Sequence, residues 1–500
     1  MPKNFSDLID YYPVKTQRLL EILTGLIPWV VILFLLVGSF YFPNAVAYMV
    51  LVFNVYWLYR SFQTSLFVIV GYLNLKATIN TDWNQKLLAL PQTSEIYHLI
   101  IIPNVKEPLA TLERNVLALL KQTFNPKQLI VVLAMEDRAR EFDADKPEYI
   151  VKKYGAKFKK IFVTWHPIVA GETVGKHSNN AYAAKTVKKI LIDEQKLNID
   201  NIIVTTCDVD TVFHEKYFSL LTYKFLTCNK PYNRFFQAPF FMNNNVHRLP
   251  PFMRLRILMG DAGRLAGLQK PSGRIMNFSA YSVALKLLDT VGYWDVDVIP
   301  EDWHINLKSY FALHGDVDII PLNIPVYGDA PESVTTWKTI KNTYQAEKRW
   351  AWGVSDIPYV IKNFIQHPEI PLINRLNKLL LTAEWHITWS TSWFLITIGA
   401  TLPTILNPAF ARTALGYSLP KLSSLILTTC IVGLLLMTFY GYLLNPNAKN
   451  KIRSFLHPLT FLQWALLPVL GFFFGMLPGL ESQTRLMLGK YIEYRVTEKV

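Results

Sequence analysis

A long uncharged stretch near the N-terminus limits how this chain can fold. Residues 22–59 contain no Asp, Glu, Lys or Arg, and Pro43-Asn44 lies near the middle as a turn signal. Because a helix needs about 20 apolar residues to cross a bilayer, the stretch predicts two membrane helices joined by a tight hairpin. Arg60 then interrupts the second hydrophobic segment, which resumes as far as Leu75. We expect either a helix that extends past the bilayer or one that keeps Arg60 in a polar interior.

Three more uncharged blocks occupy the C-terminal part of the chain. They cover residues 385–411, 422–448 and 454–480, with 27 residues each, and each is long enough to cross a membrane. The last block contains three prolines, Pro458, Pro468 and Pro478. Because proline removes a helical hydrogen bond, this block is either one ordinary crossing or, as we favour, a re-entrant or interfacial hairpin.

The basic residues indicate the orientation in the membrane. Lys3, Lys15 and Arg18 precede the first hydrophobic segment, whereas the hairpin at residues 41–44 has no basic residue. The positive-inside rule therefore predicts a multi-pass protein of the cell membrane whose N-terminus and soluble domain are cytoplasmic. The net charge of +14 is spread over the membrane flanks and the domain surface. Without a basic stripe, it argues against binding of nucleic acid.

Between the two hydrophobic regions, apolar runs alternate with helix-like segments. The apolar runs cover residues 98–103, 128–134, 160–163 and 201–206, and helical spacing appears at residues 109–121 and 178–194. This alternation predicts a doubly wound α/β domain with a parallel sheet covered on both faces. Ligands of such sheets bind beyond the carboxyl ends of the strands, so polar residues there are the candidate site residues.

Two carboxylates one residue apart follow the run at 201–206. Asp208 and Asp210 form a D-x-D motif, which lets oxygen ligands hold a hard divalent cation, Mg²⁺ or Mn²⁺, against a diphosphate. A turn with two solvated aspartates is the other explanation, and the motif alone does not decide between them.

Other predicted strand ends carry weaker signals of the same kind. The first run ends at Pro103 with Glu107 close behind, and the second leads into Glu136-Asp137. Acidic residues at such places also stabilise helix N-termini without any ligand. Lys176 follows a glycine and opens a helix-like segment, an arrangement suited to an anion.

Two later segments combine charged groups with aromatic rings. Glu301-Asp302-Trp303 puts a carboxylate pair next to an indole, as a general base beside a sugar-stacking surface would require. The neighbouring His304 is expected to be structural. Arg349-Trp350 offers a cation for phosphate and a flat face for a pyranose ring, or else a membrane-interface anchor.

With these motifs in this order, the chain resembles the membrane-embedded family-2 glycosyltransferases, which include cellulose and hyaluronan synthases. The resemblance covers nearly the whole chain and implies a cytosolic GT-A-type domain between N-terminal and C-terminal transmembrane helices. Gln345 and Arg349-Trp350 resemble the family's Q-x-x-R-W motif with one extra residue in the spacing. The segment from Tyr494 to Lys499 is similar to the gating loop of cellulose-synthase-like enzymes.

The resemblance implies roles for the candidate site residues. Asp302 is the expected catalytic base, Asp208 and Asp210 are the expected metal ligands, and Asp137 is expected near the uracil of the donor. The candidate donor-binding residues are Pro103, Glu107, Asp137, Lys176, Asp208, Arg349, Thr497 and Lys499. The candidate acceptor-binding residues are Glu301, Trp303, Gln345 and Trp350.

The sequence thus predicts an inverting hexosyltransferase that moves a sugar from a nucleotide-sugar donor, expected to be a UDP-sugar, to a saccharide acceptor at the membrane. Polymerisation with translocation of a polysaccharide and single transfer to a lipid-linked acceptor both stay open. A transporter with a nucleotide-binding domain is the alternative from another class, because Arg60, Glu384 and His386 are ionisable groups at membrane depth.

The predicted organisation has five parts. They are a transmembrane hairpin (1–76), a cytosolic GT-A domain (77–355), interfacial helices (356–384), a C-terminal transmembrane region (385–480) and an interfacial segment with a gating-loop-like tail (481–500).

Overall fold

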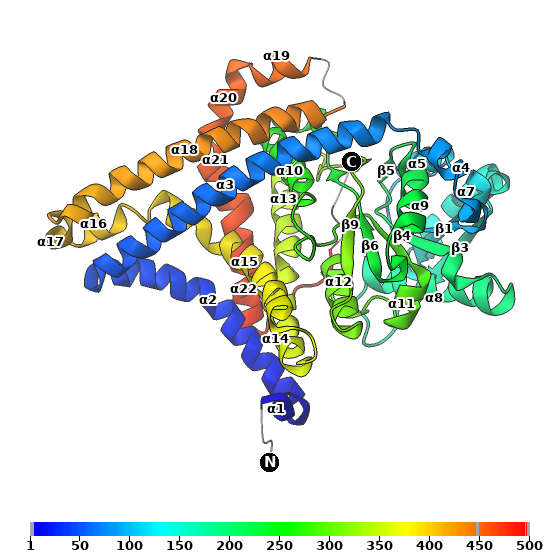
Figure 1. The fold of residues 1–500 in the computed structure, drawn as a ribbon, viewed down its shortest axis with the longest axis horizontal. Coiled ribbons are helices and arrows are strands. Elements are labelled where there is room, and N and C mark those ends of the chain that lie inside the picture. The colour runs from blue at the N-terminus through cyan, green and yellow to red at the C-terminus, as the bar shows by residue number, and fades with distance from the viewer. Residues whose placement is uncertain (1–4, 447–449, 496, 498–500) are drawn as a thin grey trace.

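The computed structural model describes residues 5–446, 450–495 and 497. Figure 1 shows a sheet flanked by helices on one side of the molecule and the long helices α2, α3 and α18 extending away from it on the other. These long helices are α2 (Pro13–Tyr41), α3 (Pro43–Asn80) and α18 (Ala414–Leu444). Each is long and apolar enough to cross a membrane.

The sheet that carries the cavity described below has seven strands in the order β3-β2-β1-β4-β8-β6-β9. Its strands are β1 (Tyr97–Asn104), β2 (Leu129–Glu136), β3 (Lys160–His166), β4 (Ile202–Thr206), β6 (Arg234–Gln237), β8 (Tyr281–Ala284) and β9 (Asp318–Pro321). The central strands β1, β2 and β4 are mostly apolar and almost completely buried because helices cover both faces, which agrees with the apolar runs in the sequence.

The sheet is mixed, so the prediction of a parallel sheet was wrong for part of it. Strands β3, β2, β1 and β4 are parallel, but β8 is antiparallel to both of its neighbours, β4 and β6. A second, three-stranded sheet combines β5 (Val212–Phe213), β10 (Val326–Tyr327) and β7 (Phe240–Phe241). Its strands have two residues each, which is too short for a periodic signal in the sequence.

Helices of the soluble part surround the large sheet. They are α4 (Trp83–Leu88), α5 (Leu109–Leu120), α6 (Arg140–Asp143), α7 (Asp145–Tyr154), α8 (Lys176–Lys188), α9 (Tyr217–Thr227), α10 (Pro251–Gly267), α11 (Leu285–Thr290), α12 (Glu301–Ala312), α13 (Thr336–Ala351) and α14 (Asp356–Gln366). Helix α10 also packs against α3 and α18, so it joins the soluble part to the long apolar helices.

The first hydrophobic region forms the expected helical hairpin. Helix α3 has 38 residues and is about 57 Å long, more than the thickness of a bilayer. The helix is longer than a bilayer is thick, and Arg60 lies against a cavity with its Nε 3.4 Å from Glu384 Oε1, so its structure is compatible with both alternatives for Arg60.

The uncharged block at 385–411 is less regular than expected. It consists of the end of α15 (Leu372–Thr397), followed by α16 (Leu402–Leu406) and α17 (Pro408–Ala411). Helix α15 is not among the three helices in the described part of the chain that are apolar enough to span. Asn407 Nδ2 donates to the Phe40 carbonyl at 2.9 Å, so this block nevertheless reaches the turn between α2 and α3.

The last uncharged block is broken, as its prolines predict. It starts with α19 (Lys451–Phe455), α20 (Pro458–Trp464) and α21 (Leu467–Gly471), and continues through a π-helical turn into α22 (Leu477–Leu488). Helix α22 packs on α2, α13 and α15 instead of forming a separate long span.

Candidate functional site

A cavity of about 630 Å³ lies beyond the carboxyl ends of β1, β2 and β4. Its wall includes the starts of α8 and α12, the C-terminal half of α13 and the chain after α22. On the opposite side it is bounded by α3 and α15, so one continuous space joins the strand ends to α3, one of the long apolar helices. Parallel α/β sheets bind ligands at these strand ends, which makes the cavity the candidate active site.

The D-x-D motif lies in this wall. Asn115, on α5, donates to the carbonyl oxygens of Asp208 and Val209 at 3.2 Å each and so fixes the turn. Asp210 is 1% exposed, and its Oδ2 accepts the backbone N–H of Asp329 at 2.5 Å. Asp329 also lines the cavity, where Arg114 and Asn244 hold its carboxylate.

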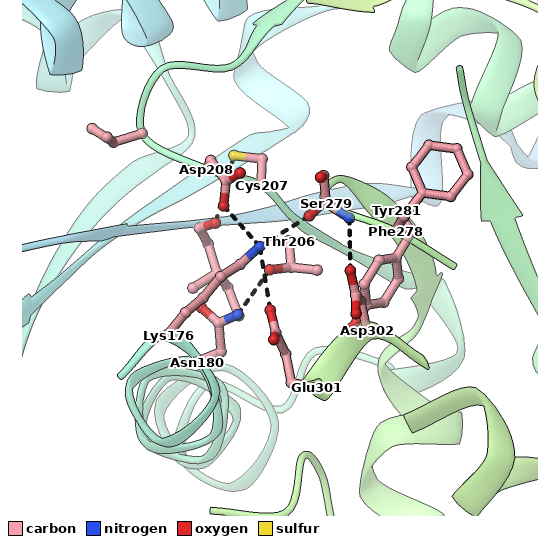
Figure 2. Close-up of polar contacts among 12 residues, drawn as sticks. Lys176, Asn180, Thr206, Cys207, Asp208, Phe278, Ser279, Tyr281, Glu301 and Asp302 are labelled. Carbon is pink, nitrogen blue, oxygen red and sulfur yellow. Dashed lines mark hydrogen bonds and ion pairs between the residues drawn. The ribbon is translucent and has the colours of Figure 1, made fainter. Parts of the chain in front are cut away.

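Lys176 connects the D-x-D motif to the carboxylates at the start of α12. Figure 2 shows its amino group between Asp208 and Glu301, 2.9 Å from Asp208 Oδ1 and 3.5 Å from Glu301 Oε1. It also donates to the Ser279 carbonyl at 3.0 Å. Lys176 is 8% exposed, and although burial opposes its charge, Asp208 and Glu301 hold its pKa well above the usual value. The site therefore keeps a buried cation at pH 7.

Asp302 is oriented by backbone groups. Its Oδ2 accepts the Ser279 N–H at 3.0 Å and its Oδ1 accepts the Trp303 N–H at 2.9 Å. Ser279 has φ +54, an uncommon value for a residue with a side chain, and such strain clusters at functional sites. Burial and the neighbouring Glu301 raise the pKa of Asp302 to about 7, against the opposing effect of Lys176. A carboxyl group with this pKa can take up a proton near neutral pH.

The structure brings most of the predicted residues together around the cavity. Those that line it are Pro103, Glu107, Lys176, Asp208, Asp210, Glu301, Asp302, Trp303, Arg349, Trp350 and Thr497. Glu107 also has a local role, because its Oε2 accepts the backbone N–H groups of Val105 and Lys106.

Two of the predicted residues lie away from the cavity wall. Asp137 does not line the cavity; its side chain is 45% exposed and pairs with Arg140, and the preceding Glu136 lines the cavity instead. Gln345 does not line it either, in agreement with the extra residue in its spacing, whereas Glu347 on the same helix does. Lys499 lies outside the described residues.

The chain after α22 closes one side of the cavity. Arg349 Nη2 donates to Thr497 Oγ1 at 3.2 Å, and its guanidinium lies 5.0 Å from the centre of the Tyr494 ring. The same ring packs edge-on to His177 and covers Gly175, where an added Cβ would lie 2.7 Å from Tyr494 Cγ. These contacts join residues far apart in sequence and hold the segment after α22, hereafter the tail, at the candidate active site.

Aromatic side chains line the part of the cavity near α15. Trp303 lies 5.9 Å from Trp385 and 5.5 Å from His386, measured between ring centres, and Trp389 stacks nearly parallel to His386. Trp350 adds a fourth indole to the wall. Flat apolar faces of this kind suit the apolar side of a sugar ring.

His304 is structural, as expected. Its Nδ1 lies 2.6 Å from Asp356 and its Nε2 lies 3.0 Å from Asp295. The two carboxylates raise the pKa of His304 to about 9 despite burial, so the ring is a buried cation in an ion-pair network. It does not line the cavity.

The oxygen-rich donor set fits a hard divalent cation. Asp208 and Asp210 both present carboxylates to the cavity, and the carboxylate of Asp329 lies in the same wall. Mg²⁺ and Mn²⁺ prefer such oxygen ligands. A second group of possible metal ligands in the described chain consists of His314, His367 and Glu369, but these residues do not line the cavity.

Comparison with known proteins adds a family match. The family described as glycosyl transferase family group 2 matches residues 203–475, more than half of the chain. That range contains Asp208, Asp210, Asp302 and the Arg349-Trp350 pair. A comparison with curated proteins found no match.

Two solved structures resemble parts of the fold. The mannosyltransferase PcManGT from Pyrobaculum calidifontis, in complex with GDP-Man and Mn²⁺, has a TM-score of 0.44 and 14% sequence identity, over 80% of this chain and 100% of its own. Residues 1–349 of TarS from S. aureus, in complex with UDP-GlcNAc, have a TM-score of 0.35 and 12% identity, over 68% of this chain and 90% of their own. Because both TM-scores are below 0.5, family membership rests on the sequence match.

Proposed function

The chain belongs to glycosyl transferase family group 2, and from that membership we propose that it transfers a sugar from a nucleotide-sugar donor to an acceptor at a membrane surface. The observation that carries the proposal is the position of Asp302. This partly buried carboxyl group, with its pKa of about 7, shares one cavity with the D-x-D aspartates and with α3, one of the helices that are apolar enough to span a membrane.

The donor would bind beside the D-x-D motif. Asp208 and Asp210 would hold Mg²⁺ or Mn²⁺, which supplies positive charge to the diphosphate of the donor and to the leaving nucleotide. Arg349 and Lys176 add cationic groups of the protein to the same wall, and Pro103, Glu107 and Glu136 border the space for the rest of the nucleotide. Asp137, exposed and paired with Arg140, fits this role less well than Glu136.

Asp302 would act as the general base. The acceptor hydroxyl gives its proton to the Asp302 carboxylate while its oxygen bonds to the anomeric carbon of the donor. The bond from that carbon to the diphosphate breaks on the opposite side, so the configuration inverts. The N–H groups of Ser279 and Trp303 hold the carboxylate in place for this step.

The acceptor would occupy the aromatic end of the cavity. Glu301, Trp303 and Trp350 are the proposed contacts, with Trp385 and Trp389 continuing the wall along α15. Stacking of indoles on sugar rings supports a saccharide in this position. Polymer synthesis and single transfer to a lipid-linked saccharide both use this arrangement.

The protein would cross the membrane four times. Helices α2, α3 and α18 provide three crossings and the segment from α15 to α17 the fourth, since Asn407 meets the α2–α3 turn. The N-terminus, the soluble domain and the tail then share the cytoplasmic side. A transporter would have no need of a base beside a D-x-D motif, so the site favours the enzyme.

The test is acceptor-dependent release of nucleoside diphosphate by the full chain in native membranes. Wild-type protein should turn over at least one nucleotide sugar from a panel of UDP- and GDP-sugars. Asp302→Asn should slow transfer by about 10²–10⁴-fold, as loss of a general base does, while donor affinity stays similar. Transfer at the wild-type rate by Asp302→Asn would make Asp302 a structural carboxylate, with Glu301 the next candidate base.

A further inference from the structure

Several cations face the end of the cavity that is closest to the long apolar helices. Arg256 pairs with Glu347 and Arg264 pairs with Asp261, so these two are neutralised locally. Arg60, Lys270 and Arg274 also line this end. Of these three, Arg60 forms an ion pair with Glu384 at 3.4 Å. The hydroxyl group of Tyr56 donates a hydrogen bond of 2.6 Å to the same carboxylate.

Arg274 and Lys270 have no ion pair among the described residues, and Lys270 is the one that also lies against an aromatic ring. Among the residues that the structure describes, no carboxylate lies within ion-pair distance of its amino group, which sits 5.7 Å from the centre of the Trp385 ring. Burial and the positive charge of Arg60 lower the pKa of Lys270 to about 8, against the smaller opposing effect of Glu384. At pH 7 most molecules still carry this charge, so a half-buried lysine is held against another cation inside a cavity.

The position of Arg60 along α3 corresponds to the depth of a lipid headgroup in a bilayer. Arg60 is 17 positions along α3 from Pro43, about 26 Å from the hairpin turn. The hydrocarbon core of a bilayer is about 30 Å thick, so Arg60 lies near its opposite boundary. Trp385 and Trp389 on α15 have the character of the aromatic belt at that boundary. Arg60, Gln63, Thr64 and Phe67 form one face of α3, and this face lines the cavity.

An unpartnered polar side chain points to a ligand at the same place. His386 is 2% exposed and lines the cavity, and neither ring nitrogen has a hydrogen-bond partner in the described part of the chain. Buried polar groups are nearly always satisfied, so an unmet pair of nitrogens is explained by a polar group that arrives with a ligand.

We propose that Lys270 and Arg60 bind the phosphate of a lipid-linked acceptor, which His386 also contacts. The phosphate stays at the membrane surface while the hydroxyl that receives the sugar reaches Asp302 through the aromatic part of the cavity. A neutral glycan would leave Lys270 uncompensated, whereas a phosphate ester supplies the missing negative charge at the right depth. The inference rests on the proposed function and names its acceptor class.

The test measures lipid binding without requiring turnover. The full chain is purified in a non-ionic detergent and titrated into phosphatidic acid with a fluorescent acyl chain, with the matched diacylglycerol as the neutral lipid. We expect phosphatidic acid to bind more tightly than diacylglycerol, and Lys270→Gln to weaken its binding by about tenfold or more. Lys270→Arg should restore most of the affinity.

Lys76→Gln is the matched control. Lys76 also lies on α3 with its amino group 5.7 Å from an aromatic ring, that of Tyr72, but it does not line the cavity. Its removal should leave the affinity for phosphatidic acid unchanged, which separates a site from general attraction of basic residues to anionic lipid.

Three outcomes would overturn the inference. They are equal binding by wild type and Lys270→Gln, equal loss in Lys76→Gln, and competition by glycerol 3-phosphate as strong as by the lipid, which would indicate a soluble phosphate ligand. Binding of nucleoside diphosphate with Mn²⁺, measured on the same samples, shows that each variant is folded. Absence of nucleotide binding in the wild type would refute the proposed function independently of the lipid result.

Discussion

Burial is the largest influence on the pKa of Asp302, and two charged neighbours modify it. Glu301 carries a like charge beside it and raises its pKa, while the ammonium group of Lys176 lowers it. Burial adds to the effect of Glu301, because a low-dielectric environment disfavours a second negative charge. The balance leaves the pKa at about 7, which is far above that of an exposed aspartate.

This balance predicts the pH dependence of transfer. A base acts in its ionised form, so the rate should rise as the pH increases through about 7 and then level off. Glu301→Gln removes the like charge and lowers the pKa of Asp302, so the rise should move to lower pH. Rates measured between pH 5 and 9 at saturating donor would show the shift, and an unchanged profile in Glu301→Gln would contradict the assignment of Asp302 as the titrating group.

The sequence was sufficient for those site residues whose motifs are local. Asp208 and Asp210 follow a clear strand, and Glu301-Asp302 adjoin an aromatic residue, so all four could be expected at the site. Asp329 could not, because its backbone N–H is held at the site by the carboxylate of Asp210, which is 119 positions away. Glu136 and Asp137 are adjacent, and the sequence alone does not distinguish them as candidate site residues. In the structure, Glu136 at the end of β2 lines the cavity and Asp137 does not.

At the scale of elements, the tail and the start of α8 form one contact. Gly175 leaves room for the Tyr494 ring, and Arg349 on α13 holds the ring and Thr497 from the other side. The tail therefore covers the part of the cavity where the donor phosphates are proposed to bind.

Gly175→Ala should displace the tail without altering the tail's sequence. The new Cβ would lie 2.7 Å from Tyr494 Cγ, closer than two carbon atoms can approach. The backbone of Gly175 is extended, so alanine itself fits there. We expect turnover to fall by roughly ten- to a hundredfold with little change in melting temperature. Deletion of residues 491–500 should have a similar effect, and normal turnover in both variants would exclude a role for the tail in catalysis.

The helices and strands also show which features could be predicted from the sequence and which could not. The apolar runs located β1 to β4 within a few residues, because strands buried on both faces are apolar throughout. The antiparallel β8 could not be predicted, because its direction depends on where the long connection after α10 re-enters the sheet. Similarly, the uncharged block at 385–411 predicted one span, whereas the structure divides it between the end of α15, which lines the cavity, and the short helices α16 and α17.

For the whole molecule, the position of the tail supports the proposed re-entrant geometry of the last uncharged block. Thr497 contacts Arg349 of the soluble domain, so the chain after α22 lies on the same side as that domain. The segment from α19 to α22 consists of several short helices and does not form a single straight helix. Such a broken segment is compatible with a chain that returns to the side of the soluble domain.

Cysteine labelling can test the resulting topology. In a variant whose native Cys207, Cys228 and Cys430 are replaced, Glu493→Cys should react with a membrane-impermeant thiol reagent only after the cytoplasmic face is opened. Phe42→Cys, at the exposed α2–α3 turn, is the matched control and should react in intact cells. Labelling of Glu493→Cys in intact cells would contradict the four-crossing topology and the proposed role of the tail.

The central claim is that the cavity binds a nucleotide sugar through a divalent cation held by the D-x-D motif. The most direct measurement is calorimetric titration of the purified full chain with UDP- and GDP-sugars, with Mn²⁺ and with excess chelator. We expect at least one donor to bind with Mn²⁺ only, and Asp210→Asn to lose more than about 100-fold in affinity while remaining folded. Equal donor affinity in chelator, or in Asp210→Asn, would contradict the account.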